Sequence, residues 1–404
     1  MALFQYVARS DNDTKKITST IQADSERAAA KLLIARGLTP VEIIAVDAPK
    51  GLFKNMTDRI KSKDRVIFFR QLSTLLNAGL PLAQSLRTVA DQTTNERLKA
   101  AIQEIIADIE GGKALSVAFA KHPNIASNVV VALIGAGEVS GTLDRSLERV
   151  ANQLEKDAEV ISKVRGAMVY PAIVVIVIVI VITFMMVSVI PQIEQLYKDL
   201  RQSLPFVTLV MVMVANFVRY FWWLLILLSI GGAYFLRQYI NTEKGRNQWD
   251  AIKYNMPLFG GMFRKLYMAR FARTGEVLMS SGVQVLEVLK ICAEAVNNVK
   301  VGQAIKRAAE KVKGGKALSV SLKDEEYILP LIPQMLGVGE QSGSIDTMME
   351  KTATYYEKEL DAEIRAISTA IEPVLMVMLA VVAGFLVVAI LLPIYGLVGS
   401  GAIR

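Results

Sequence analysis

Two long uncharged runs dominate the hydrophobic pattern of the chain. Residues 172–190 and 374–392 each extend for 19 residues without a charged side chain. An α-helix rises about 1.5 Å per residue, so about 20 apolar residues cross a hydrocarbon core of roughly 30 Å. Soluble cores rarely contain apolar runs of this length. Each run therefore predicts a membrane-spanning helix.

A third apolar segment, residues 206–238, is interrupted by Arg219 and by the aromatic cluster at 220–223. Amphipathic rings favour the headgroup level, and an arginine there can reach phosphates. We therefore expect about 221–238 to be buried in the bilayer, with Arg219 as an interfacial anchor. A tilted helix that starts near Phe206 and an intramembrane charge on a substrate path are the alternatives.

Lysine and arginine residues gather on one side of the three predicted spans. They precede the first span, follow the second and precede the third, whereas the loop 192–205 carries only Lys198 and Arg201. Because cytoplasmic flanks hold more basic residues, we expect a cytoplasmic N-terminus and an external C-terminus. Residues 1–20 lack the apolar region of a secretory signal, so the first span is expected to direct insertion.

The chain contains an internal repeat. GGKALSV at 111–117 recurs at 314–320, and GEVSGTLD at 137–144 aligns with GEQSGSID at 339–346. Pro171 and Pro373 open the first and third spans at corresponding places. Collinear matches of this kind indicate duplication of one unit, a helical domain followed by a span. Both copies keep the same orientation, which does not fit the inverted repeats of many transporters.

The repeated domain shows helical periodicity throughout. Apolar residues recur at three and four along 66–76 and 143–161, and Thr93 with Glu96 has the spacing of a capping box. We expect about six helices in each copy. Residues 1–48 instead predict strands near 3–8, 17–21 and 41–46 with a helix over 26–36.

The predicted fold class is a mostly α integral membrane protein. It has two duplicated cytoplasmic helical-bundle domains, three transmembrane helices and a small N-terminal ββαβ unit. The predicted boundaries are the ββαβ unit 1–48, linker 49–63, helical domain 64–170, span 171–191, external loop 192–205, span 206–238, helical domain 239–372, span 373–397 and external tail 398–404.

The sequence offers little catalytic chemistry. It has one histidine, His122, and one cysteine, Cys292, so a His/Cys zinc site or an intrachain disulfide is not available. GGKALS lacks the residues that a phosphate-binding loop needs. The net charge of +8 comes from 46 basic and 38 acidic residues that are interleaved, without a nucleic-acid-binding stripe. We predict no enzyme, metal, cofactor or nucleic-acid partner.

The GExSG motifs allow several interpretations. Their glycines predict tight turns or close helix approach, and their serines are predicted to cap the next helix. Alternatively, the two glutamates hold a cation or take part in contacts between subunits. The candidate motif residues are Gly79, Gly137, Glu138, Ser140, Gly141, Gly282, Gly339, Glu340, Ser342 and Gly343. The candidate membrane-junction residues are Tyr170, Pro171, Glu372 and Pro373.

These motifs resemble a known family. The run FFRQLSTLLNAGLPLAQSL at 68–86, its partner at 269–289 and both GExSG turns are similar to the platform proteins of type IV pili and type II secretion, the general secretion pathway protein F family. The resemblance covers nearly the whole chain. Gln284 stands where that family often has proline, and Ile125 where an aromatic residue is common.

The resemblance implies a non-enzymatic scaffold in the bacterial inner membrane, present as a homo-oligomer, a dimer. Its expected partners are a hexameric secretion or pilus ATPase, pilin or pseudopilin subunits, other inner-membrane assembly proteins and the lipid bilayer. Pilus, secretion and DNA-uptake systems all remain open. The alternative function is a small-solute transporter, for which the first and third spans offer only Thr183 and Ser188 as polar groups.

Overall fold

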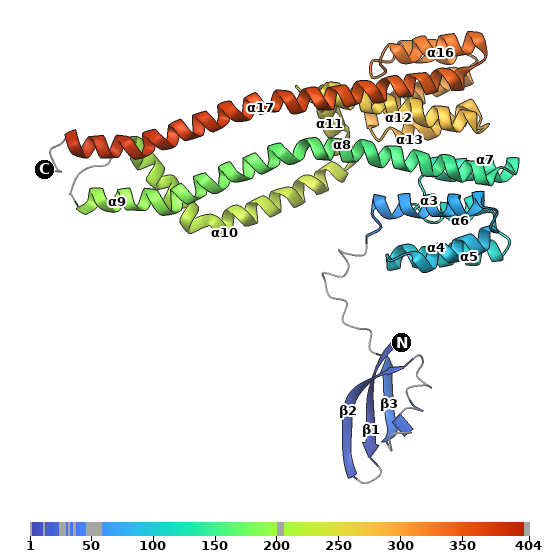
Figure 1. Ribbon diagram of the computed structural model, residues 1–404, viewed down its shortest axis with the longest axis horizontal. Helices are drawn as coiled ribbons and strands as arrows, with labels where there is room; N and C mark the ends of the chain where they lie inside the picture. The colour runs from blue at the N-terminus through green and yellow to red at the C-terminus, as the bar shows by residue number, and fades with distance from the viewer. Residues whose placement is uncertain are drawn as a thin grey trace. The chain divides into compact units, whose positions relative to one another are not determined.

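The computed structural model of this chain describes residues 2–10, 13–23, 30, 33–34, 38–45, 59–199 and 206–399 (Figure 1). The chain forms two compact units. The first comprises Met1–Lys61 and Gln92–Ala101, and the second comprises Ser62–Asp91 and Ile102–Arg404.

The first unit contains a three-stranded antiparallel sheet in the order β2-β1-β3. Its strands are β1 (Ala2–Ser10), β2 (Asp13–Ala23) and β3 (Leu38–Ala45). Pro40 lies opposite Ala8 on the edge strand β3, next to a register shift, where a missing N–H is tolerated. The helix expected over 26–36 falls mostly outside the described residues, so the complete ββαβ unit stays a prediction.

The first unit also contains the start of helix α5 (Glu96–Glu110). Asn95 Oδ1 accepts hydrogen bonds from Arg97 N and Leu98 N, both at 3.1 Å. The N-cap is therefore Asn95, and the capping box predicted from Thr93 is wrong. Helix α5 begins at Glu96, which places this glutamate in the first helical position instead of the third.

Apart from Gln92–Ala101, which belong to the first unit, the second unit contains the duplication as two sets of six helices, which confirms the duplicated helical bundles of the predicted fold class. The first set is α3 (Ser62–Asn77), α4 (Leu82–Gln92), α5, α6 (Leu115–Ala120), α7 (Asn128–Ser140) and α8 (Leu143–Phe184). The second set is α12 (Gly260–Ser280), α13 (Val285–Ala295), α14 (Val299–Lys313), α15 (Leu318–Lys323), α16 (Leu331–Ser342) and α17 (Ile345–Gly399).

Aromatic packing forms the core of the first copy. Phe68 and Phe69 of α3 are fully buried with Phe119 of α6, and ring centroids lie 4.8 Å apart for Phe68–Phe69 and 5.5 Å for Phe69–Phe119. The second copy buries Phe271 and Leu322 at the corresponding places. Truncating one such ring to alanine costs about 3–5 kcal/mol, so this cluster is central to the domain.

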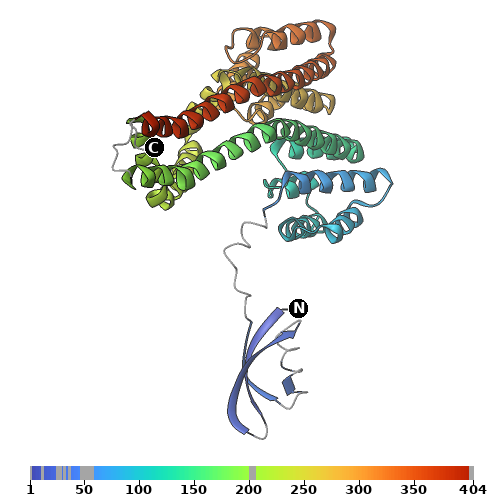
Figure 2. The same cartoon turned by 60° about the vertical axis from the view of Figure 1, so that its left-hand side comes forward.

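Two long helices pass without interruption from the helical copies into apolar sequence (Figures 1 and 2). Helix α8 contains Pro171 in its interior, and α17 continues through Pro373. The predicted boundaries between helical domain and span, at 170/171 and 372/373, therefore fall inside continuous helices. Proline removes one backbone hydrogen bond, which a long apolar helix can tolerate.

Three helical segments are long and apolar enough to cross a membrane: Leu143–Asp199, Thr208–Asn241 and Ile345–Val388. Apolar side chains on them face outwards, among them Ile176, Leu228 and Val381. This agrees with the three predicted spans.

Residues 192–199 of the predicted external loop 192–205 are helical. A π-helical turn η1 (Met185–Val189) follows α8 and leads into α9 (Ile190–Asp199). Ile190, Ile193 and Tyr197 pack against Met211 and Val212. Their spacing of three and four residues gives α9 an apolar face, and that face explains why the segment is not a loop.

Helix α10 (Phe206–Asn241) bends at Phe221, where φ is −112° and ψ is 17°. Before the bend it packs on α9, and after it Leu227 and Leu228 are exposed. The bend coincides with the predicted start of the bilayer-buried part at about 221. Helix α11 (Glu243–Asn255) follows and is capped by Thr242 Oγ1, which accepts from Gly245 N at 3.1 Å.

Candidate functional site

The two repeated motifs of the first copy meet in space. Helix α6 has no side-chain cap from Ala114, its N-cap residue. The Glu138 carboxylate of α7 caps it instead. This carboxylate accepts hydrogen bonds from Leu115 N, from Ser116 N at 3.1 Å and from the Ser116 hydroxyl at 2.5 Å. First-turn N–H groups have no partner in their own helix and favour negative charge, so Glu138 holds the start of α6.

The second copy repeats this arrangement. Glu340 of α16 accepts from Leu318 N at 2.5 Å, from Ser319 N at 3.3 Å and from the Ser319 hydroxyl. We call each set, Glu138 with Leu115 and Ser116 or Glu340 with Leu318 and Ser319, a glutamate cap. N–H and O–H donors point at each carboxylate. This geometry does not favour the cation site considered for the two glutamates, and the described residues contain no group of potential metal ligands.

The motif glycines have two separate roles. Gly141 and Gly343 end α7 and α16 with φ of 71° and 66°, a left-handed conformation that glycine adopts without strain. Gly137 faces Ser146, whose Cβ would lie 2.6 Å from an added side chain, and Gly339 would bring a Cβ to 2.8 Å from Ile345 Cα. The prediction of a tight turn with close helix approach is therefore confirmed.

The motif serines do not cap the following helix, and that prediction is wrong. Ser140 Oγ donates back to Ala136 O at 2.7 Å, and Ser342 Oγ donates to Val338 O at 2.8 Å. Thr142, the N-cap residue of α8, accepts no side-chain cap bond. Each serine lies in the helix that precedes the turn, and its hydroxyl binds the carbonyl four residues earlier in that same helix.

Gly79 and Gly282 form matching turns after α3 and α12. Their φ angles are 84° and 81°, and the following residues, Leu80 and Val283, donate to Leu75 O and Leu278 O, both at 3.1 Å. The glycines thus reverse the chain between the first two helices of each copy.

An ion-pair cluster on the third helix differs between the copies. In the first copy Asp108 of α5 pairs with Lys113 at 2.6 Å and with Lys121. Hydrogen bonds from both lysines lower the pKa of Asp108. Here the acid is on the helix and the bases follow it.

The second copy has the opposite arrangement of charge. Lys311, the counterpart of Asp108, pairs with Glu325 at 2.9 Å, and Arg307 pairs with the same carboxylate at 2.6 Å. Burial alone would raise the pKa of Glu325, but the hydrogen bonds from Arg307 and Lys311 outweigh it and lower this pKa. Ion pairs therefore hold the corresponding helices α5 and α14 in the two copies, but the acidic and basic positions are exchanged.

The single histidine and cysteine lie within this framework. His122, the counterpart of Glu325, is mostly buried with its Nε2 3.5 Å from the Glu104 carboxylate. Cys292 is fully buried and 3.8 Å from Phe271 O, and burial raises the pKa of its thiol. Neither belongs to a group of three or more potential metal ligands in the part of the chain that the structure describes.

The membrane-junction candidates lie on the surfaces of α8 and α17. Tyr170 and Glu372 are exposed, and the two prolines lie within their helices. The hydroxyl of Thr183 donates to Val179 O at 2.7 Å in its own helix. This polar group of the first span is thus satisfied locally, which does not favour the transporter alternative.

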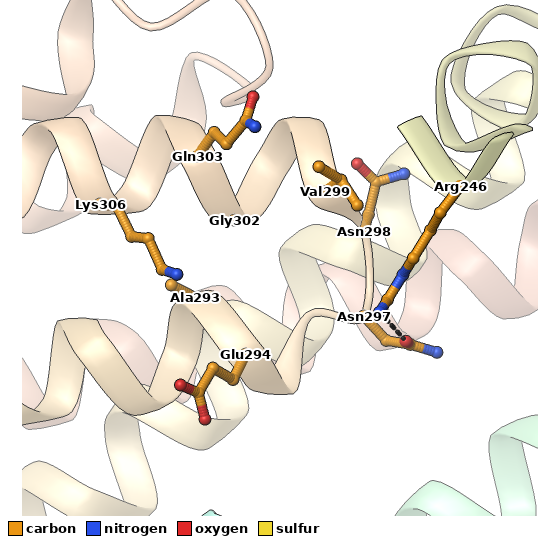
Figure 3. A pocket seen from close by; sticks show the side chains of 9 residues that line it. All are labelled: Arg246, Ala293, Glu294, Asn297, Asn298, Val299, Gly302, Gln303 and Lys306. Atoms are coloured by element: carbon orange, nitrogen blue, oxygen red, sulfur yellow. Dashed lines mark hydrogen bonds between the residues drawn. The ribbon is translucent and has the colours of Figure 1, made fainter. Parts of the chain in front are cut away.

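A surface pocket of about 390 Å³ lies beside α13 and α14 (Figure 3). Arg246 Nη2 donates to Asn297 Oδ1 at 3.3 Å across it, and Glu294 and Lys306 also line it. Among the described residues, the buried polar atoms that lack a hydrogen-bond partner are those of His122, Gln153, Thr208 and Asn247, none of which lines this pocket. We assign it no ligand.

Comparison with known proteins agrees with the duplication. Residues 68–191 and 271–393 both match the family described as type II secretion system (T2SS), protein F. Residues 1–44 match the N-terminal domain of type II secretion system protein F. The chain belongs to the type II secretion system protein F family. The two matches cover corresponding parts of the two copies, including the glutamate caps and two of the spans.

Relatives in this family serve two kinds of machine. The type IV pilus assembly protein PilC of Thermus thermophilus is 36% identical over the full length of both chains. PilC of Pseudomonas aeruginosa is 32% identical over 84% of this chain and 91% of its own. Type II secretion system protein F of P. aeruginosa is 30% identical over 98% of this chain and 99% of its own. With three apolar helices, this family member is an inner-membrane protein.

The glutamate cap could have been found more fully from the sequence. The GExSG repeat indicates Glu138 and Glu340 but not their serine partners. Ser116 and Ser319 are identical between the copies and lie 22 and 21 residues before the glutamates. A polar pair retained in both copies at nearly constant separation indicates contact.

Proposed function

We propose that this chain is the inner-membrane platform of a type IV pilus assembly machine, and that it couples a hexameric cytoplasmic ATPase to the assembly of pilin subunits. The observation that carries this proposal is the continuity of α8 and α17. Each helix packs within a helical copy and then runs through a proline into apolar sequence. Movement of either copy is therefore transmitted along a covalent helix to the bilayer.

The relatives support a pilus in preference to secretion. Those named for type IV pilus assembly are 32–36% identical, whereas those named for type II secretion are 28–31% identical. The basic flanks support a cytoplasmic N-terminus and an external C-terminus. We retain 64–170 and 239–372 as the two cytoplasmic domains, which function in a homodimer without catalysis of their own.

Contacts between the copies support joint movement. Lys163 Nζ of α8 lies 2.8 Å from Asp361 Oδ2 of α17, and Arg149 Nη1 donates to Ser281 Oγ at 2.6 Å. Movement imposed on one copy is therefore transferred to the other.

The partner proposal is tested by affinity capture of the tagged chain from native membranes, followed by mass spectrometry. We expect a hexameric pilus ATPase and prepilins to be recovered with the chain. Recovery of secretion pseudopilins would indicate a secretion machine instead of a pilus. Recovery of neither prepilins nor pseudopilins, and of no ATPase, while the chain stays oligomeric would reject the platform proposal.

The coupling proposal is tested at Val169 and Tyr170, which are exposed on α8 just before Pro171. Replacing both by glycine loosens the helix, whereas replacing both by alanine removes the same side chains and keeps it. We expect the glycine pair to abolish pilus assembly and the alanine pair to retain it. Normal assembly by a glycine pair that is present at the usual level would contradict coupling.

A further inference from the structure

An apolar groove of about 280 Å³ lies where the helical copies meet the spans. It is formed by α8, α11, α12 and α17, and residues from all four helices line it, including Ala167, Trp249, Phe263 and Ile371. Its lining is almost entirely apolar. The side chains around it are incompletely covered, and Met168 is 45% exposed.

The groove is continuous with the lipid-facing surface of two spans. Met168 lies three residues before Pro171, and Ile371 lies two before Pro373, which is within about one helical turn of each apolar run. Ile173 and Val374, just beyond the two prolines, are exposed apolar residues on the spans. A molecule that covers these spans therefore has direct access to the groove.

One basic residue lines the groove, and two others are adjacent in sequence to lining residues. Lys253 lines it and pairs with Asp250 at 2.6 Å. Arg165 and Arg365 directly follow the lining residues Val164 and Ile364. Both arginines are exposed, and neither forms a side-chain ion pair within the described ranges 59–199 and 206–399. Exposed cations at the edge of a bilayer attract anionic phospholipids.

We propose that the groove binds one acyl chain of an anionic phospholipid from the leaflet that borders the helical copies, with the lipid phosphate near Arg165 and Arg365. The acyl chain covers Phe259 and Phe263, which belong to the second helical copy and not to a span. The lipid thereby joins α12 to α8 and α17 at the membrane surface. The identification of this leaflet as the cytoplasmic one rests on the topology proposed above, and the rest of the proposal does not.

The test uses the full chain in vesicles that contain a phosphatidylglycerol with a photoreactive group on its acyl chain. We expect cross-links on peptides spanning 256–263, which lie outside the spans. Ala167→Trp fills the groove and should lower this labelling at least fivefold. The matched variant Ala172→Trp places the same ring on the exposed surface of the span and should leave it unchanged.

Two results would overturn the proposal. Labelling of 256–263 no stronger than labelling of α16 would show that lipid does not enter, and labelling that appears only when the vesicles hold single protomers would show that a second protomer covers the groove. If Ala167→Trp fails to fold, Ala167→Leu provides a milder filling. Because the purified chain is labelled without ATPase or pilin, this outcome is independent of the platform function.

Headgroup selectivity is tested with the same acyl probe on phosphatidylcholine. We expect the phosphatidylglycerol probe to label 256–263 several-fold more strongly, and Arg165→Gln with Arg365→Gln to remove that difference. Equal labelling by both probes in the unmodified chain would reject the anionic headgroup.

Discussion

Arg273 donates through Nε and Nη2 to the two carboxylate oxygens of Glu357, both at 2.9 Å. This bidentate pair joins the first helix of the second copy to its long helix α17. Arg70 and Glu155 form the equivalent pair in the first copy, with Nε donating at 2.6 Å. The environments differ, because the Arg273 side chain is 10% exposed and that of Arg70 is 35% exposed.

The difference in exposure predicts unequal costs for the same substitution. Arg273→Gln leaves Glu357 without its main partner in a partly buried site and is expected to cost about 3 kcal/mol. Arg70→Gln breaks a more exposed pair and should cost about 1 kcal/mol or less. Unfolding of the purified chain in detergent compares the two variants. Equal losses would mean that burial does not set the strength of these pairs.

Glu138→Gln tests the glutamate cap. The amide retains the shape of the side chain but loses the negative charge, so the first turn of α6 should open more often, at a cost of about 1 kcal/mol. We expect faster amide hydrogen exchange in 111–120 by mass spectrometry, with 314–323 unchanged as the internal control. Glu340→Gln should reverse the pattern, and unaltered exchange in both variants would contradict the capping role.

Gly141→Ala tests the turn between α7 and α8. Its φ of 71° strains an alanine, and we expect a loss of about 1 kcal/mol in the stability of the chain. Gly166 lies inside α8, and a Cβ added there would meet no neighbouring atom within 4 Å, so Gly166→Ala should be neutral or stabilising. A melting temperature that falls equally in both variants would argue against strain at Gly141.

The ion pairs of Glu325 predict a dependence of stability on pH. Because the folded state lowers the pKa of Glu325 below its ordinary value of 4.5, these pairs stabilise the fold above that pH. Their contribution is lost as the pH falls through the lowered pKa. We expect the melting temperature of Glu325→Gln to fall below that of the unmodified chain at pH 7 and to approach it in acid. A difference that stays constant between pH 7 and pH 3 would contradict the assignment.

The sequence specified the features that depend on periodicity and duplication. The apolar runs predicted the three spans, and the repeat predicted two copies with about six helices each. Both were predictable because helical spacing and membrane thickness impose a pattern on each segment of sequence by itself. The glycine turns were also predictable, since few other residues adopt the φ angles of Gly141 and Gly343.

The features that the sequence did not reveal depend on tertiary contact. The capping role of Glu138 exists only because α7 lies beside α6, which brings residues 22 apart in sequence together. Helix α9 is stabilised by packing on α10, whereas its position between two predicted spans had indicated an external loop. Pro171 and Pro373 remain helical because the rest of each long helix compensates for one missing hydrogen bond.

Helix α17 extends over 55 residues, from Ile345 to Gly399. At about 1.5 Å per residue it is about 80 Å long. In a rod of this length, a tilt of about 5° at one end displaces the other end by about 7 Å. A side-chain repacking among the helical copies that tilted this rod by about 5° would thus displace its far end by more than one helical turn.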